Sequence, residues 1–278
     1  MVSSLVELAS SRELLANLTL REVRGKYKRT VLGQGWSLIN PVATMLIYTM
    51  VFGFLLRVEL EPGNPSGLDI FALWLMCGLL PWAFLANTVT SGLVSLVSNA
   101  NLVNKVYFPR EILVAATVLS WDVTFCIEMG VLALVLLLFG AFVLPWLPLV
   151  LVFMALLTMF GLGLALLLSI ANVYFRDSQH FVGILLQLWF FLTPIVYPLS
   201  YVEEQEARLA ADGNDLPLVA IYKLNPMEHF VSAFRSLLYD NRLPTAEDTV
   251  WCIAAAMASL AIGYVVFQRY EGRIAEEL

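Results

Sequence analysis

Six long runs of apolar residues constrain the fold more than any other feature of this sequence. These runs occupy about residues 38–56, 70–97, 112–139, 147–171, 181–199 and 250–267. A helix needs about 20 residues, at 1.5 Å each, to cross the hydrocarbon core of a bilayer, and the runs are near that length or longer. Because 60% of the 278 residues are hydrophobic and only 14% are charged, the sequence predicts an all-α polytopic membrane protein with six transmembrane helices.

Lysine and arginine mark one side of this expected bundle. Of the 16 basic residues, six lie in segment 1–35, two in 98–111, one in 172–180 and two after the last run. Basic residues concentrate on the cytoplasmic side of membrane proteins, so both termini and the 98–111 loop are expected to face the cytoplasm. No linker divides the chain, and we expect a cytoplasmic segment at 1–35 followed by one transmembrane domain at 36–278.

The segment before the first run predicts a surface helix. The stretch SSRELLANLTLREV places Ser10 and Glu13 in the spacing of a capping box, followed by leucines separated by charged residues. This pattern predicts an N-terminal amphipathic interface helix that lies along the cytoplasmic membrane surface. The alternative is a juxtamembrane helix that only sets orientation. Residues 1–35 hold no continuous apolar stretch, so no cleavable signal peptide is expected.

The long segment before the last run predicts short helices on the outer side. Ser200 and Glu203 begin a polar, acidic helical stretch that Gly213 can end. The mixed apolar stretch that follows is broken at Asn225-Pro226 into two pieces that are too short to span. We expect a pair of re-entrant outer helices before the last span, with protein covering their free backbone groups.

Motifs for enzyme chemistry, metal binding and nucleic-acid binding are missing. The sequence has no GxxxxGK[ST] phosphate loop, no HExxH and no plausible GxSxG triad, and neither His180 nor His229 has a second ligand at metal spacing. The only basic cluster, at 21–29, precedes the first span, where headgroup contact explains it and argues against nucleic acid. Cysteines without a CxxC pairing lie inside apolar runs, at Cys77, Cys126 and Cys252. We therefore expect no catalytic residue, metal ion or disulfide in this chain.

Two acidic residues lie inside the third run. Asp122 and Glu128 are separated by about 240° on a helix, so they do not form a carboxylate pair. Each costs about 2.5–3.5 kcal/mol at the bilayer centre and must face protein or water. Asp122 is interpreted as a group that pins neighbouring helices by a hydrogen bond, with a role in function as the alternative. Glu128 lies nearer the outer end, where it can reach the interface.

Four stretches, in order along the chain, resemble one family. They are REVRGKYKRTVLGQGWSLINPVATMLIYTMVFG, NLVNKVYFPREIL, NVYFRDSQHFVGILLQLWFFLTPIVYP and LNPMEHFVSAFRSLLY. Each is similar to the corresponding piece of the membrane subunit of type-2 ATP-binding-cassette exporters for bacterial surface polysaccharides, such as O-antigen, capsule, teichoic acid and galactan. The resemblance covers about residues 12–267. The acidic helix at about 203–215 is longer than the connection usual in this family.

The resemblance implies an assembly and a substrate. Such a permease has six spans, an interface helix and re-entrant gate helices, and it works as two copies with two copies of a separate cytoplasmic ATPase. ATP and magnesium bind to that ATPase, so this chain is not itself an enzyme and carries no cofactor. The implied cargo is a lipid-linked glycan or teichoic-acid-type polymer that crosses the bacterial plasma membrane, where membrane lipids contact the permease.

The resemblance also assigns residues to roles. The second stretch implies a coupling helix that docks on the ATPase through Lys105, Tyr107, Phe108, Pro109, Arg110 and Glu111. In it Tyr107 and Phe108 are apolar anchors, Lys105, Arg110 and Glu111 form an exposed polar rim, and Pro109 fixes a bend. The third implies a second contact at Arg176 and Asp177. Residues of the implied outer gate are Asn225, Pro226 and Arg235. Aromatic candidates to line a channel, because their rings suit sugar faces, are Tyr48, Phe52, Trp82, Trp189, Phe190, Phe191 and Tyr197.

Other interpretations stay open for the residues and the function. Arg110 and Arg176 can be explained by orientation alone, and aromatics in a span can face lipid or the core. A small-molecule or drug exporter of the same superfamily would share topology and ATPase partner but would have a closed apolar pocket. An ion-coupled secondary transporter would show inverted repeats, and no convincing internal repeat is present.

Overall fold

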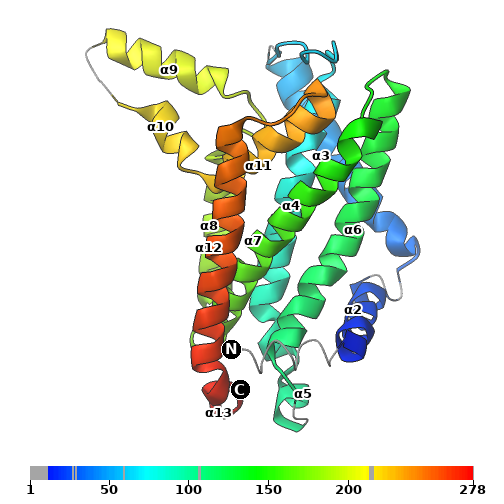
Figure 1. Cartoon of the computed structure of the whole chain (residues 1–278), viewed down its shortest axis with the longest axis vertical. Helices are drawn as coiled ribbons and strands as arrows, with labels where there is room; N and C mark the ends of the chain where they lie inside the picture. Colours follow the sequence, from blue (N-terminus) through cyan, green and yellow to red (C-terminus); the bar gives the residue numbers. More distant parts are fainter. Residues whose placement is uncertain are drawn as a thin grey trace.

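The structure is a computed structural model that describes residues 12–26, 28, 30–58, 60–105, 108–212 and 216–277. These residues form helices joined by turns and loops, with no β-strand among them. Figure 1 shows the longer helices running along the long axis of the molecule, with shorter helices at both ends. The predicted all-α fold class is confirmed for the described part of the chain.

Within the described residues, five helical segments are long and apolar enough to cross a membrane. The first joins α3 (Trp36–Tyr48) to the π-helical η2 (Thr49–Leu55). The others are α4 (Phe71–Ser98), α6 (Glu111–Leu138), η3 (Leu144–Trp146) with α7 (Leu147–Tyr174), and α12 (Ala246–Tyr270) with η5 (Glu271–Arg273). These segments coincide with five of the six expected spans and have closely similar boundaries.

The sixth expected span, 181–199, is not one continuous helix. Helix α8 (Ser178–Phe191) has 14 residues and is followed by turns up to α9 (Ser200–Ala211). At 1.5 Å per residue α8 is about 21 Å long, whereas the hydrocarbon core is about 30 Å thick. Pro194 explains the end of the helix, because proline has no N–H to donate and its ring clashes with the preceding turn. The structure therefore shows five candidate spans among the described residues, and the sixth stays a prediction.

The five long segments differ strongly in how much of their surface is buried. In the most apolar stretch of α4, 78% of the residues are buried, whereas none are buried in the most apolar stretch of the α3–η2 segment. Helices α7 and α12 pack closest: a Cβ atom added to Gly163 or Gly263 would collide with the backbone of the facing helix. The hydroxyl of Ser259 on α12 donates to the Phe160 carbonyl on α7 at 2.8 Å. Such close approach of small residues is typical of helix pairs in membranes.

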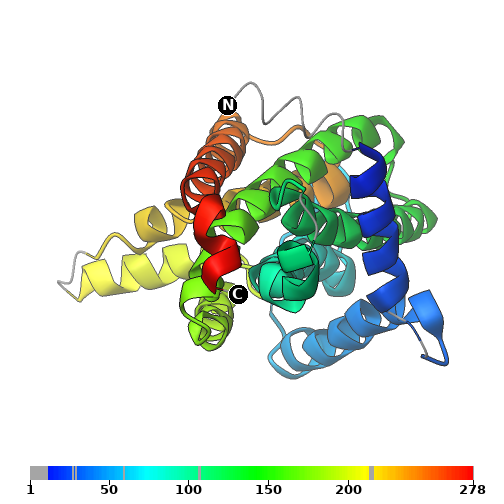
Figure 2. The same ribbon diagram turned by 90° about the horizontal axis from the view of Figure 1, so that it is seen from below.

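The short helices separate into two groups at opposite ends. Helices α2 (Arg12–Lys26), α5 (Ala100–Lys105) and α13 (Ile274–Glu277) lie at the lower end in Figure 1. Figure 2 shows α2 along its length, crossing one edge of the bundle. At the upper end, α9 and α10 (Leu218–Lys223) extend away from the long helices. The basic segments thus gather at the end opposite α9 and α10, as the charge distribution predicts.

The segment expected to be re-entrant is packed inside the upper end of the bundle. Helix α11 (Pro226–Arg235) crosses there and continues as the π-helical η4 (Ser236–Asp240). Its largely apolar face is at most 1% exposed at Met227, Phe230, Val231, Ala233, Phe234, Leu237, Leu238 and Tyr239. This burial explains how a helix too short to span stays in place.

Candidate functional site

Most of the aromatic channel candidates form one cluster between α3, α4 and α8. The ring of Tyr48 stacks on Phe190 with centroids 5.9 Å apart, and Trp82 lies 5.7 Å from both Trp189 and Phe190. The candidates joined by ring contacts are Tyr48, Phe52, Trp82, Trp189, Phe190 and Phe191. Sequence reasoning missed Phe160 on α7, whose ring lies 6.3 Å from Trp189, because nothing in the apolar pattern of α7 distinguishes it from its neighbours.

A pocket of about 440 Å³ opens beside this aromatic cluster. Tyr48, Trp82, Phe190 and Phe191 line it together with polar side chains, among them Thr44, Asn87 and Gln187. The cluster is partly core and partly surface: Trp82 and Phe190 are 6% and 8% exposed, whereas Phe191 is 51% exposed. Trp82 and Phe190 therefore contribute little exposed surface to the pocket, whereas Phe191 contributes much of its ring.

Tyr197 stands apart from the aromatic cluster. Its hydroxyl donates to the Phe191 carbonyl at 2.6 Å and lies 3.0 Å from the hydroxyl of Tyr222 on α10. These contacts fix the turn after α8 against α10, so the structure assigns Tyr197 to the outer helices rather than to the ring cluster.

Asn225 joins the aromatic cluster to the buried helix α11. Its Oδ1 accepts from the Trp189 indole at 2.7 Å and from the Met227 amide at 3.0 Å, the second bond being an N-cap. Its Nδ2 donates to Thr193 Oγ1 at 2.8 Å and to the Leu192 carbonyl at 3.2 Å. Pro226 then occupies the first helical position, where a missing N–H costs nothing. The sequence predicted a break at Asn225-Pro226 but not this four-bond connection.

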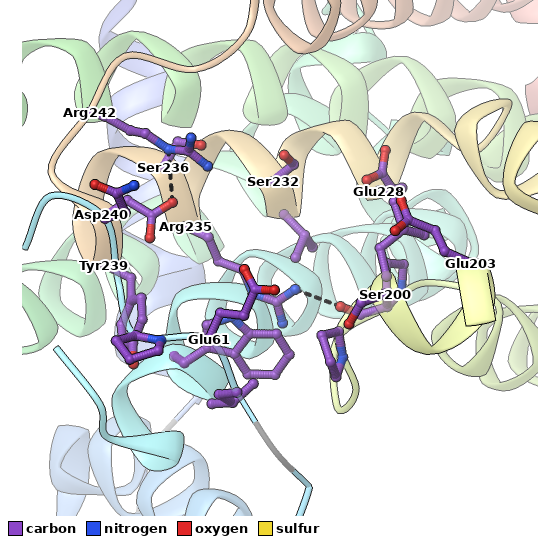
Figure 3. Close-up of a pocket in the computed structure, with 18 residues that line it drawn as sticks. Glu61, Ser200, Glu203, Glu228, Ser232, Arg235, Ser236, Tyr239, Asp240 and Arg242 are labelled. Carbon is purple, nitrogen blue, oxygen red and sulfur yellow. Dashed lines mark hydrogen bonds and ion pairs between the residues drawn. The ribbon is translucent and has the colours of Figure 1, made fainter. Parts of the chain in front are cut away.

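Arg235 holds the other end of α11 against the turn after α8. Its guanidinium donates to the carbonyls of Pro194 and Ile195 at 2.7 Å each and lies 3.5 Å from the ring centroid of Trp74. Arg235 lines a pocket of about 520 Å³ at the upper end, which the acidic side chains of Glu61, Glu203, Glu228 and Asp240 also line (Figure 3). Arg235 thus joins the end of α11 to the turn after α8.

His229 lies in a buried charged cluster that the sequence analysis did not foresee. Its Nδ1 is 2.7 Å from Asp248 Oδ1 and 3.3 Å from Glu228 Oε2, and its Nε2 is 2.8 Å from the Lys223 carbonyl. The sequence has no second ligand at metal spacing from His229, but the fold brings Asp248 of α12 to it from 19 residues away. Both ring nitrogens face oxygen acceptors, so the geometry favours the doubly protonated imidazolium, which has no lone pair for a metal ion.

The pKa of His229 follows from these contacts. Burial lowers this pKa, but the hydrogen bonds to Asp248 and to the Lys223 carbonyl, together with Glu228, outweigh burial and raise it above the ordinary 6.5. The imidazolium therefore ties α10, α11 and α12 together at the outer end.

The two acidic residues of the third run have different surroundings. Asp122 accepts a hydrogen bond from Thr158 Oγ1 at 2.9 Å, which links α6 to α7 as its interpretation as a helix-pinning group requires. Glu128 does not simply reach the outer interface: it lines a pocket that Lys26 of α2 also lines. This meeting of the N-terminal helix with the third run was not predicted.

The residues of the expected coupling segment divide into exposed and packed ones. Lys105, Arg176 and Asp177 are exposed at the lower end, beside Phe175, which is 68% exposed and belongs to the same YFRDSQH stretch at 174–180. Tyr107 lies outside the described residues. Phe108 is half-buried and packs against a core cluster of this chain that includes Val103, Ile112 and Ile274.

Two further coupling candidates are held inside the chain. The backbone N–H of Arg110 donates to Glu271 Oε1 at 3.3 Å, and its guanidinium donates to the Glu271 carbonyl. Glu111 is 4% exposed, so it does not form an exposed polar rim as expected. Pro109 lies half-buried between Phe108 and Arg110. Among the described residues, Phe175 is thus the aromatic side chain most exposed at this end.

Comparisons with known proteins agree on one family. The ABC-2 type transporter family matches residues 13–239 of the chain. An O-antigen export system permease protein RfbA from Myxococcus xanthus is 29% identical over 278 residues, covering the whole of both chains. A protein of the same name from Klebsiella pneumoniae is 26% identical over 96% of this chain and 95% of its own. A polysialic acid transport protein KpsM from Escherichia coli is 22% identical over 91% of this chain and 92% of its own.

Proposed function

Because the chain belongs to the ABC-2 type transporter family, we propose that it is the transmembrane subunit of an ATP-driven exporter of a lipid-linked polysaccharide or teichoic-acid-type polymer. The observation that carries this proposal is the end-to-end similarity to O-antigen export permeases, at 29% identity over 278 residues. The polymer would cross the bacterial plasma membrane, with ATP hydrolysed on a separate subunit that binds ATP and magnesium.

The aromatic cluster supports a sugar polymer as the cargo. Planar apolar rings stack on the C–H faces of sugars and leave the hydroxyl groups to water. Tyr48, Phe190 and Phe191 line the pocket of about 440 Å³ together with polar side chains such as Asn87 and Gln187, which can exchange hydrogen bonds with hydroxyl groups. A polymer could thus pass along α3 and α8 without one tight binding site.

The uncovered first span supports assembly of two copies. The α3–η2 segment has no buried residue in its most apolar stretch, and Leu46, Ile47 and Met50 are each at least 60% exposed. A second copy placed against α3 and α8 would enclose the pocket between two chains, as a symmetric homodimer. Two cytoplasmic ATPases would then dock at the lower end, where Lys105, Phe175 and Arg176 are exposed. In this arrangement both termini face the cytoplasm, and α2 follows the membrane surface.

Deletion of the coding gene tests the function. We expect the deleted strain to lose a surface polysaccharide and to accumulate lipid-linked glycan inside the cell, with both defects reversed by the wild-type gene. A matched control is complementation with the gene while the partner ATPase carries a hydrolysis-deficient substitution, which should not restore export. Unchanged surface polysaccharide in the deleted strain would contradict the proposal.

A further inference from the structure

A second pocket of about 440 Å³ lies where the N-terminal helix meets the spans. It is enclosed by α2, α3, α4 and α6 and adjoins the aromatic pocket, with which it shares Thr44, Leu79, Ala83 and Asn87. The side chains that give it its chemistry are Lys26, Trp36, Asn40, Asn87, Trp121 and Glu128. A molecule in this pocket would therefore be next to the aromatic cluster.

Lys26 brings an unsatisfied cation into this pocket. Its ammonium nitrogen lies 3.5 Å from the ring centroid of Trp121, and the Trp121 indole is fixed by donating to Ser91 Oγ at 2.9 Å. The nitrogen is buried, yet none of the described residues accepts a hydrogen bond from it. An ammonium has three N–H donors, and leaving buried donors unmet is costly, so the pocket needs acceptors from a ligand or from water.

Glu128 is the acidic side chain that lines the same pocket. Burial lowers the pKa of Lys26 to about 7, and the charges of Glu22 and Glu128 oppose that shift. The pocket is thus lined by one basic and one acidic side chain. A diphosphate would satisfy Lys26 but would be repelled by Glu128, because like charges at short range disfavour each other. A hydroxyl group suits both, since it accepts from Lys26 and donates to Glu128.

We propose that this pocket binds one uncharged, hydroxyl-rich sugar residue of the exported polymer before that residue reaches the aromatic cluster. Trp36, which is 39% exposed, offers an aromatic face, and Asn40 and Asn87 offer amide donors and acceptors. This inference rests on the proposed function, because it deepens the description of the same transport path.

Binding of neutral trisaccharides to the permease–ATPase complex in sugar-free nanodiscs tests the proposal. The probes are maltotriose and triacetylchitotriose, with inorganic pyrophosphate as the anionic probe, and saturation-transfer NMR titration measures each affinity. Lys26→Met keeps the apolar stem against Trp121 but removes the donors, and Glu128→Gln keeps the side-chain shape but removes the charge. Each should weaken trisaccharide binding about tenfold, as expected for loss of a hydrogen bond to a charged group. The control is Lys28→Met, an exposed lysine two residues away, which should change nothing.

Several results would overturn the sugar site. Trisaccharide affinity that is undetectable, or equal in Lys26→Met, Glu128→Gln and wild type, would do so. Pyrophosphate binding that exceeds trisaccharide binding and depends on Lys26 would assign the pocket to phosphate instead. Gene deletion separates these failures from failure of the function: if deletion abolishes surface polysaccharide while the variants bind sugar normally, the function stands and the site is wrong. If deletion leaves surface polysaccharide intact, the function itself fails.

Discussion

Replacing Asn225 by alanine should detach the start of α11 from the aromatic cluster. The change removes the N-cap of α11, worth about 1 kcal/mol, and leaves the Trp189 indole, which donates to Asn225 at 2.7 Å, without an acceptor, at about 1–3 kcal/mol. The two bonds from Asn225 Nδ2 are lost as well. We therefore expect about 2 kcal/mol or more of local destabilisation, which is roughly a thirtyfold increase in local opening.

Hydrogen–deuterium exchange of the purified protein measures this opening directly. Amides in the first turns of α11 should exchange about thirtyfold faster in Asn225→Ala, whereas those of α9, which Asn225 does not contact, should keep their rates. Asn225→Asp is the matched control, because its carboxylate retains the acceptor for Trp189 and for the Met227 amide and loses only the two donated bonds. It should give an intermediate rate. Exchange in α11 that changes less than threefold in Asn225→Ala would refute the structural role of this side chain.

Three further predictions concern pH, helix packing and partner docking. Because the pKa of His229 is raised on folding, its stabilisation of α11 is full below about pH 6.5 and is lost as pH rises through the raised pKa. The protection factors of the α11 amides should therefore fall over that range in wild type but not in His229→Gln. The same fall in both proteins would contradict this role. Gly263→Ala should lower the yield of folded protein, at about 1–3 kcal/mol for overpacking, whereas Gly130→Ala, with open space around it, should not; equal yields would argue against the close packing. Phe175→Ala should lower the affinity of the permease for its ATPase by about thirtyfold, and less ATPase should therefore copurify, while membrane insertion stays unchanged. Normal copurification would exclude Phe175 as an anchor.

The sequence predicted elements that depend on local composition. Apolar runs located five long helical segments, because crossing a bilayer requires a continuous apolar stretch. The same criterion did not locate the end of α8 at Phe191, because the composition stays apolar up to Pro194 and beyond. The break at Asn225-Pro226 was found because the conformational restriction before proline is local.

The parts that could not be predicted depend on contacts between distant residues. Trp189 and Asn225 are 36 residues apart, and Lys26 meets Trp121 only because α2 folds back on α6. The partner of His229 was missed because spacing rules compare neighbours in sequence, whereas Asp248 is brought in by α12. Glu111 was assigned to an exposed rim by the family resemblance, whereas it is buried at the start of α6.

The backbone contact between α7 and α12 has a mechanical consequence. With no side chain between Gly163 and Gly263 and a hydrogen bond from Ser259 to Phe160, these helices cannot slide without breaking backbone packing over their shared length. We therefore expect α7 and α12 to move as one rigid unit. We also expect displacement during a cycle to fall on α3, which has no residue of its apolar stretch buried within the chain and which the proposed dimer would bring against the second copy. The helices would thus divide into a rigid pair, α7 and α12, and one segment, α3, that can shift relative to it.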